Sequence, residues 1–115
     1  MARDPRAFLW DVREATRAIQ SFLHGMDVTG FVRSELVQAA VERKFEVIGE
    51  ALNQLTKPDP SLTARIPDVA QIVAFRNQLM HGYAVVQPAT VWNIAHAAVP
   101  VLLSIVQQLL DESTD

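Results

Sequence analysis

The sequence predicts an all-α fold, a four-to-five-helix up-and-down bundle, with residues 1–115 forming a single domain. Half of the 115 residues are hydrophobic, which is enough for one compact core and argues against disorder. The apolar residues recur at helical spacing in four long segments, and no segment alternates as a strand would. The short connections between these segments are typical of neighbouring helices in a bundle.

The first predicted helix runs from Pro5 to about His24 and ends at Gly25. Asp4 precedes it as a side-chain cap, and proline is favoured at the first helical position. A glycine just beyond the last turn can adopt the left-handed conformation that closes a helix. The inward stripe of this helix is predicted to be Phe8, Val12, Ala15, Ile19, Phe22 and Leu23.

The middle of the chain is predicted to hold one long helix and one short helix. Residues 27–31 form a connector, and the long helix follows from about Ser34 to Leu55. Three prolines then mark an irregular stretch around a short helix from Ser61 to Arg65. The inward residues of the long helix are predicted to be Leu36, Val37, Ala40, Val41, Phe45, Ile48, Ala51, Leu52 and Leu55.

Two further helices complete the predicted bundle. One runs from about Pro67 to His81, with Gly82 as a left-handed cap residue. The other runs from near Pro88 to near Leu110. Pro100 lies inside this last helix, where it removes one backbone hydrogen bond and is expected to bend the helix.

The last helix is apolar over much of its circumference. Residues 84–110 contain no Asp, Glu, Lys or Arg, but the polar residues and prolines spread through them disfavour a membrane span. A helix that is apolar nearly all round is usually covered on more than one side. We therefore expect a second subunit to cover it in a homodimer. A central helix in a monomer is the alternative.

Composition limits the classes of function. The net charge is −3, which disfavours a general polyanion binder, so any contact with nucleic acid must come from a local cluster. The chain has no cysteine, which excludes disulfides and thiolate metal sites. The N-terminal stretch mixes charges and lacks an apolar core, so we expect no signal peptide. A soluble, cytoplasmic protein is the resulting prediction.

Residues 76–83, with the sequence RNQLMHGY, carry the groups that indicate chemistry. Arg76 offers a permanently charged fork that matches phosphate oxygens, and His81 can exchange a proton near neutral pH. Asn77 shares a helix face with His81, whereas Arg76 lies about 140° away from His81 around an ideal helix. Tyr83 has a phenol that can be modified. These groups favour metal-independent cleavage of RNA, whose own 2′-hydroxyl can attack the adjacent phosphate.

A structural interpretation of the same residues stays open on spacing alone. His81 and Gly82 would then form an ordinary helix C-terminus, where basic residues are favoured. Arg76 would serve only as an ion-pair partner.

The order of these residues resembles a known motif. R-N-Q-L-M-H-G-Y is similar to the Arg-x4-His-x-Tyr motif of the HEPN superfamily, in its HepT-like branch. Residues 40–55, AVERKFEVIGEALNQL, resemble the second-helix signature of that branch, with Ile48-Gly49-Glu50-Ala51 at its centre. The VWNI segment after the motif and Pro100 also fit. The similarity extends from about Arg6 to Leu110.

The resemblance implies an endoribonuclease toxin of a toxin–antitoxin pair of type VII. HEPN ribonucleases are helical dimers that join two motifs in a cleft between subunits and cut RNA without metal. The partner of HepT-like members is a minimal nucleotidyltransferase, which silences the toxin by moving AMP from ATP to the motif tyrosine. The ATP is used by that partner, so the resemblance implies no metal or cofactor for this chain.

The site residues implied by the resemblance follow from the motif positions. Arg76 clamps the phosphate and His81 is the acid or base. Asn77 orients the substrate, and Tyr83 is the AMPylation site. The expected products of cleavage are a cyclic phosphate and a free 5′-hydroxyl.

Two acidic residues of the long helix, Glu46 and Glu50, are further candidates. With Arg43 they lie at i, i+3 and i+7, on one face of the helix. We expect Glu46 or Glu50 to orient Arg76 or His81, and thereby the substrate. The alternative is an intrahelical Arg43–Glu46 pair with a solvated Glu50, since exposed pairs contribute little to stability.

A second class of function is also compatible with the sequence. The chain would then be a non-catalytic helical dimer that binds a nucleotidyltransferase or a nucleotide. The joint presence of Arg76 and His81 favours catalysis, because a pure scaffold needs neither residue.

Overall fold

The structure is a computed structural model that describes residues 3–82 and 86–112, and the regular structure in these ranges is entirely helical. The all-α prediction is therefore confirmed. Four long helices build the bundle and two short ones connect them. In chain order the helices are α1 (Pro5–Leu23), α2 (Val28–Arg33), α3 (Glu35–Thr56), α4 (Pro60–Thr63), α5 (Val69–His81) and α6 (Pro88–Glu112).

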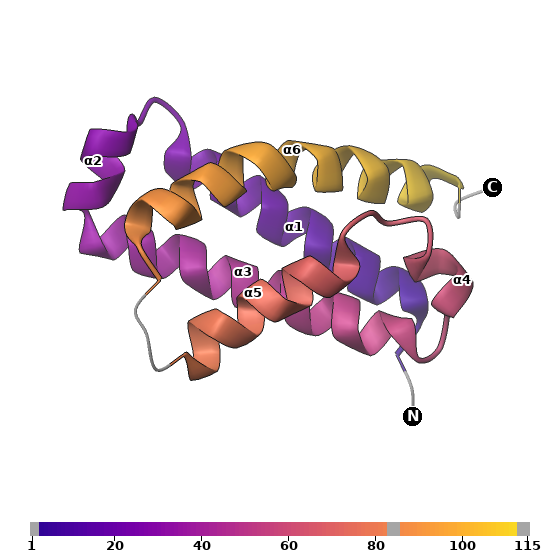
Figure 1. The fold of residues 1–115 in the computed structure, drawn as a ribbon. Helices are drawn as coiled ribbons and strands as arrows, with labels where there is room; N and C mark the ends of the chain where they lie inside the picture. Colours follow the sequence, from indigo (N-terminus) through magenta and orange to yellow (C-terminus); the bar gives the residue numbers. More distant parts are fainter. Residues whose placement is uncertain (1–2, 83–85, 113–115) are drawn as a thin grey trace.

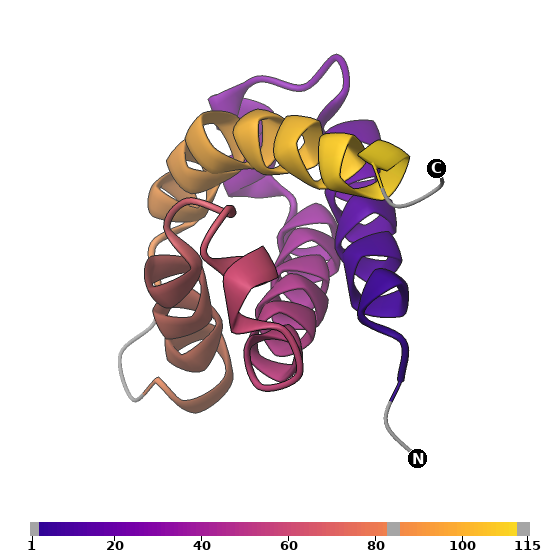
Figure 2. The ribbon, with the colours of Figure 1, turned by 90° about the vertical axis from the view of Figure 1, so that its right-hand side faces the viewer.

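Helix α3 lies in the middle of the bundle, with α1 on one side and α5 on the other (Figure 2). Helix α6 lies across the top of this layer and packs mainly on α1 (Figure 1). The short α2 contacts both α3 and α6, and α4 contacts the end of α3. The core lies between these helices, and its largest fully buried side chains include Leu9, Ile19, Phe31, Ile48, Leu52 and Leu55.

The predicted helix starts of α1 and α3 are confirmed at the level of single hydrogen bonds. The Asp4 carboxylate accepts a bond from the Arg6 backbone N–H at 2.9 Å, and Pro5 is the first helical residue. The Ser34 hydroxyl accepts a bond from the Val37 N–H at 3.2 Å. Each cap satisfies a donor that the helix itself leaves unpaired. Gly25 has the positive φ of 76° that was expected after α1.

The connector predicted for residues 27–31 is instead the start of α2. The Asp27 carboxylate accepts a bond from the Gly30 N–H at 2.8 Å and so caps this helix. Phe31 fixes α2 to the core, because its side chain is fully buried and its ring lies 5.5 Å from that of Trp92. A six-residue helix with one core residue has almost no periodicity for a sequence pattern to detect.

Both ends of α5 differ from the prediction. The helix begins at Val69 rather than Pro67, because Asp68 has a left-handed φ of 61° that no α-helix can include. At the other end Gly82 is extended, with φ −67° and ψ 129°, so the predicted left-handed cap is wrong. The Gly82 N–H donates to the Gln78 carbonyl at 2.9 Å, so the helix ends without a residue in the left-handed conformation.

Two residues that were predicted to face inward are exposed. Leu36 is 82% exposed, because it lies about 140° around α3 from the buried Val41. Phe22 is 37% exposed, whereas Ile19 and Leu23 of the same helix are buried in the core.

Helix α6 contains Pro100, as predicted, and is long and apolar enough to cross a membrane by length and composition. Its buried residues nevertheless form one stripe that packs in the core: Val91, Ala95, Val99, Leu102, Val106, Leu109 and Leu110. One side of α6 therefore packs in the core of the bundle. Only 28% of its most apolar stretch is buried inside the protomer, which leaves much apolar surface outside.

Candidate active site

Arg76 lies where α5 crosses α3, and its side chain is only 16% exposed. Its Nη2 donates to Glu50 Oε2 of α3. Its Nη1 donates to Asn77 Oδ1 at 2.8 Å. Two partners on two helices therefore hold the guanidinium, and bonds that involve charged groups are the stronger class of hydrogen bond. The orientation of this group is set before any substrate arrives.

Gly49 makes this position of Arg76 possible. A Cβ added at Gly49 would come within 2.6 Å of Arg76 Cγ, which is closer than real Cβ atoms approach. Glycine inside a helix costs about 1 kcal/mol relative to alanine. The close crossing of the two helices is the physical reason for a glycine there. This is also the one sequence signal for the crossing, a glycine inside an otherwise helical pattern.

Glu50 and Glu46 were both candidates for orienting the site, and the structure separates them. Glu50 accepts bonds from Arg76 and from Gln54 Nε2, the latter at 2.5 Å. Glu46 instead accepts a bond from Arg43 Nη1 at 3.3 Å, which is the intrahelical pair of the alternative interpretation. The predicted contact with Arg76 exists for Glu50, and its role in orienting substrate stays a prediction.

His81 is the last residue of α5 and is exposed. It lies on the face of α5 that also carries the exposed Ala70, Ala74 and Asn77. Arg76 lies on a different face, against α3, so one protomer does not bring the two motif residues together. Asn77 lies on the same face of α5 as His81, and its side-chain oxygen accepts a hydrogen bond from Arg76. It therefore links the two motif residues. Tyr83, the predicted modification site, lies outside the described residues.

A cavity of about 210 Å³ opens beside Arg76, between the N-terminal part of α1, the middle of α3 and the end of α5. The sequence did not single out Asp11, Gln54 or Met80, which line it. Their meeting depends on how three helices cross, which no local pattern encodes. Within residues 3–82 and 86–112, no group of three or more His, Asp or Glu side chains has the arrangement of a metal site.

Comparison with known proteins agrees with this arrangement of helices and motif. The family described as "Ribonuclease HepT-like" matches residues 12–109, which is most of the chain. The protein belongs to the HepT-like ribonuclease family. The resemblance seen in the motif and in the second-helix signature is thereby confirmed.

Three individual relatives illustrate the match. "Putative RNase MJ1216" of Methanocaldococcus jannaschii is 34% identical over 98 residues, which is 85% of this chain and 80% of that protein. "Putative RNase MJ0125" of the same organism is 34% identical over 98 residues, 85% and 84% of the two chains. "Probable ribonuclease HepT" of Thermococcus cleftensis is 28% identical over 102 residues, which is 89% of this chain and 92% of that protein. No solved structure matches the chain significantly.

Proposed function

We propose that this protein is an endoribonuclease toxin that cuts RNA with Arg76 and His81 and without a metal ion. The observation that carries the proposal is the largely buried guanidinium of Arg76, held in place by Glu50 and Asn77. A charged group that is oriented in advance stabilises a transition state without having to reorganise. Membership of a ribonuclease family, and the RNase names of the relatives, support RNA as the substrate.

The proposed reaction uses only the RNA and the two motif residues. A neutral His81 imidazole removes the proton of a 2′-hydroxyl, and that oxygen attacks the adjacent phosphorus. Arg76 stabilises the anionic phosphorane. The bond from phosphorus to the 5′-oxygen then breaks, and a protonated imidazole donates a proton to the leaving oxygen. The products are a 2′,3′-cyclic phosphate and a free 5′-hydroxyl, and no water is consumed.

A second copy of the chain would supply a second imidazole to the site. In one protomer Arg76 and His81 lie on faces about 140° apart. The face of His81 carries the small residues Ala70 and Ala74, and small side chains at a contact allow two helices to approach closely. Pairing of two α5 helices along this face would place two imidazoles in one cleft, one as the base and one as the acid.

The apolar surface of α6 independently favours association with a second copy of the chain. Much of this helix is apolar but outside the protomer core, as shown by Val101, which is 51% exposed. An apolar cavity of about 340 Å³ also lies between α3, α5 and α6, lined by Phe45, Phe75 and Ile94 among others. Exposed apolar surface of this kind is typical of an interface.

The proposed off switch is Tyr83, two residues beyond His81 in the sequence. Transfer of AMP to its phenol by a nucleotidyltransferase antitoxin would add a bulky anion two residues from His81 in the sequence. That anion would repel the phosphates of RNA, as charge-adding modifications do at anionic interfaces. Intact mass before and after incubation with the antitoxin and ATP tests this step, and Tyr83→Phe should remain unmodified. A mass gain in Tyr83→Phe would refute the assignment.

Cleavage in the presence of excess EDTA tests the proposed activity directly. Protein with an unmodified Tyr83 is incubated with a mixed-sequence RNA, and His81→Ala is compared with wild type. Loss of the imidazole should slow cleavage by about 10²–10⁴-fold. His24→Ala is the matched control, because His24 is an exposed histidine at the end of α1, outside the motif. Equal rates for wild type and His81→Ala would overturn the proposal.

A further inference from the structure

The cavity beside Arg76 has an apolar floor that the cleavage chemistry does not use. Phe8 of α1, Val47 and Ala51 of α3 and Met80 of α5 line it. Phe8 and Ala51 are buried, whereas Met80 is 44% exposed. An apolar surface that opens directly beside a phosphate-binding arginine is suited to a flat, weakly polar group of the same substrate.

The rim of the cavity is charged, and its charges balance. Each of the three arginines that line it is paired with a carboxylate that also lines it. The pairs are Arg3–Asp11 at 2.8 Å, Arg43–Glu46 at 3.3 Å and Arg76–Glu50. A second phosphate at this place would meet as many negative as positive groups and would gain little from them. A neutral group avoids that repulsion.

The size of the cavity limits what it can hold. Its volume of about 210 Å³ is several times the roughly 30 Å³ share of one water molecule. It is smaller than the roughly 300–1,000 Å³ of pockets that enclose drug-sized ligands. One planar ring system fits this range, and a whole nucleotide does not.

We propose that this cavity holds one base of the RNA substrate, beside the phosphate on Arg76, and selects bases that carry an exocyclic amino group. The inference rests on the proposed ribonuclease function and adds sequence preference to it. Proteins read single-stranded RNA by packing splayed bases on side chains and bonding to their edges. The carboxylates of Asp11, Glu46 and Glu50 only accept hydrogen bonds, and each has lone pairs beyond those used by its arginine.

Cytosine and uracil form the sharpest test pair. Cytosine carries an amino donor where uracil carries a carbonyl acceptor. The free carboxylate lone pairs of the rim can accept the amino group of cytosine, whereas a carboxylate has no hydrogen to donate to the carbonyl of uracil. Adenine and guanine also carry amino groups, so the preference is against uracil rather than for a single base.

Binding is measured in His81→Ala protein, so that the result does not depend on cleavage. The methionine methyl groups are labelled with ¹³C, and cytidine or uridine is titrated in while methyl resonances are recorded. Met80 lines the cavity, and Met26 packs beside the core away from it, so Met26 is an internal control. We expect the Met80 methyl to shift with cytidine at concentrations about threefold to tenfold lower than with uridine, the effect of one partly exposed hydrogen bond.

A single substitution at the rim tests the role of the carboxylates. Glu46→Gln replaces a carboxylate, which only accepts hydrogen bonds, by an amide that can also donate them. The ratio of the affinities for cytidine and uridine should therefore fall toward one. Glu35→Gln is the matched control, because Glu35 is an exposed residue of the same helix that does not line the cavity. In wild type, cleavage of RNAs that differ by one C-to-U change beside the cut should show the same preference.

The outcomes separate this inference from the proposed function. Equal Met80 shifts with both nucleosides, or none with either, would overturn base selection even if wild type cuts RNA. A selective Met80 shift that Glu46→Gln abolishes would support the base site even if no RNA is cut, and the failure would then lie in the proposed catalysis.

Discussion

Arg76 of α5 lies directly over Gly49 of α3, closer than any residue with a side chain would permit. The next residue of α3, Glu50, binds the guanidinium of the same arginine. Gly49 thus leaves room for the side chain of Arg76, and Glu50 forms an ion pair with its guanidinium. The guanidinium of Arg76 is therefore positioned by α3 as much as by the helix that carries it.

Replacing Gly49 by alanine should separate α3 and α5 and displace Arg76. Alanine favours a helix by about 1 kcal/mol, but overpacking at a close contact costs about 1–3 kcal/mol. We expect a net loss of up to about 2 kcal/mol in the free energy of unfolding, together with a larger loss of cleavage. Denaturant unfolding and RNA cleavage measure the two effects.

Gly30→Ala is the control for this substitution. A Cβ at Gly30 would lie 3.3 Å from Asp27 Oδ1, a side-chain atom that can move, and Gly30 is in α2, which does not contain the motif. Its cleavage rate should equal that of wild type. If Gly49→Ala also cleaves at the wild-type rate, the close crossing has no part in positioning Arg76.

Glu50→Gln should weaken catalysis while the protein stays folded. The substitution keeps the shape of the side chain but removes the charge that orients Arg76. A hydrogen bond to a charged group contributes about 1.5–3 kcal/mol, which corresponds to about a tenfold to hundredfold fall in kcat. The measurement is kcat and KM on one RNA, with the melting temperature as a check on folding.

Glu14→Gln in α1 serves as the comparison for stability and for kcat, because Glu14 does not line the cavity beside Arg76. Its ion pair with Arg17 is exposed, with the arginine side chain 54% accessible, and exposed pairs contribute only about 0–1 kcal/mol. A Glu50→Gln enzyme with an unchanged kcat would show that the contact with Arg76 is structural only.

Ala74→Arg should prevent two α5 helices from pairing. Ala74 lies on the exposed face that also carries His81, and a long charged side chain there would block close approach. We expect sedimentation to show a monomer with unchanged helical circular dichroism, and cleavage to be lost. Gln20→Arg, at an exposed position on α1, should leave both properties as in wild type. A dimeric Ala74→Arg protein would place the interface elsewhere.

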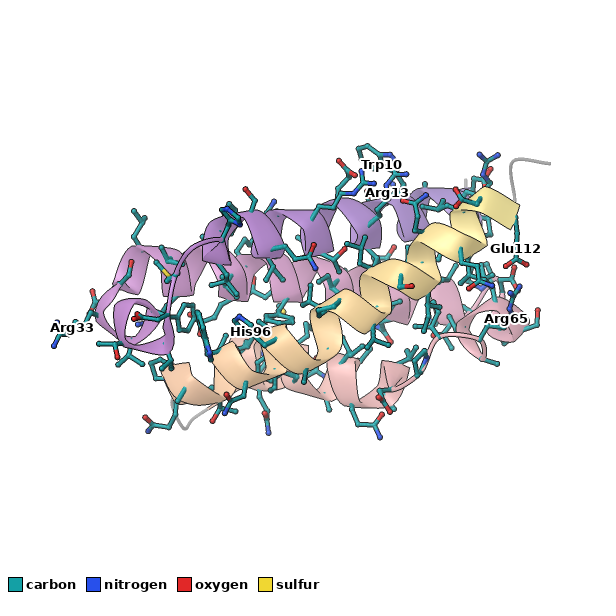
Figure 3. All side chains as sticks on the ribbon, turned by 90° about the horizontal axis from the view of Figure 1, so that it is seen from above. Trp10, Arg13, Arg33, Arg65, His96 and Glu112 are labelled. Atoms are coloured by element: carbon teal, nitrogen blue, oxygen red, sulfur yellow. The ribbon has the colours of Figure 1, made fainter. Side chains whose placement is uncertain are left out.

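The ion pair between Arg65 and Glu112 should make the free energy of unfolding depend on pH in the acid range. The two side chains face each other between the segment after α4 and the end of α6, 2.7 Å apart (Figure 3). The hydrogen bond from Arg65 lowers the pKa of Glu112, and the charge of Arg65 acts in the same direction. The ion pair therefore contributes fully to the free energy of unfolding when the pH is above the pKa of Glu112 in the unfolded chain. This contribution is lost as the pH falls through the lower pKa of Glu112 in the folded protein.

Unfolding of wild type and Glu112→Gln across a pH series measures this dependence. Wild type should be the more stable protein at neutral pH, and the difference should vanish in strong acid. Because both groups are exposed, added salt should also reduce the difference. A difference that persists in strong acid would mean that Glu112 acts through packing rather than charge.

Local signals in the sequence were sufficient for most helix boundaries. Asp4 with Pro5 predicted the start of α1, because a cap acts on donors only two or three residues away. The same logic applies to Asp27, whose side chain caps α2 within a segment that was predicted to be a connector. Gly82 shows the opposite case, since a residue that favours the left-handed conformation took an extended one when Gln78 satisfied its N–H.

By itself the sequence determined the all-helical class, the long helices and the motif residues Arg76 and His81, because periodicity, caps and residue chemistry act over short distances along the chain. Only the tertiary structure decided that Glu50 rather than Glu46 meets Arg76. That outcome depends on where α3 and α5 cross. The crossing is set by how closely the two backbones approach at Gly49, which involves residues far apart in the sequence.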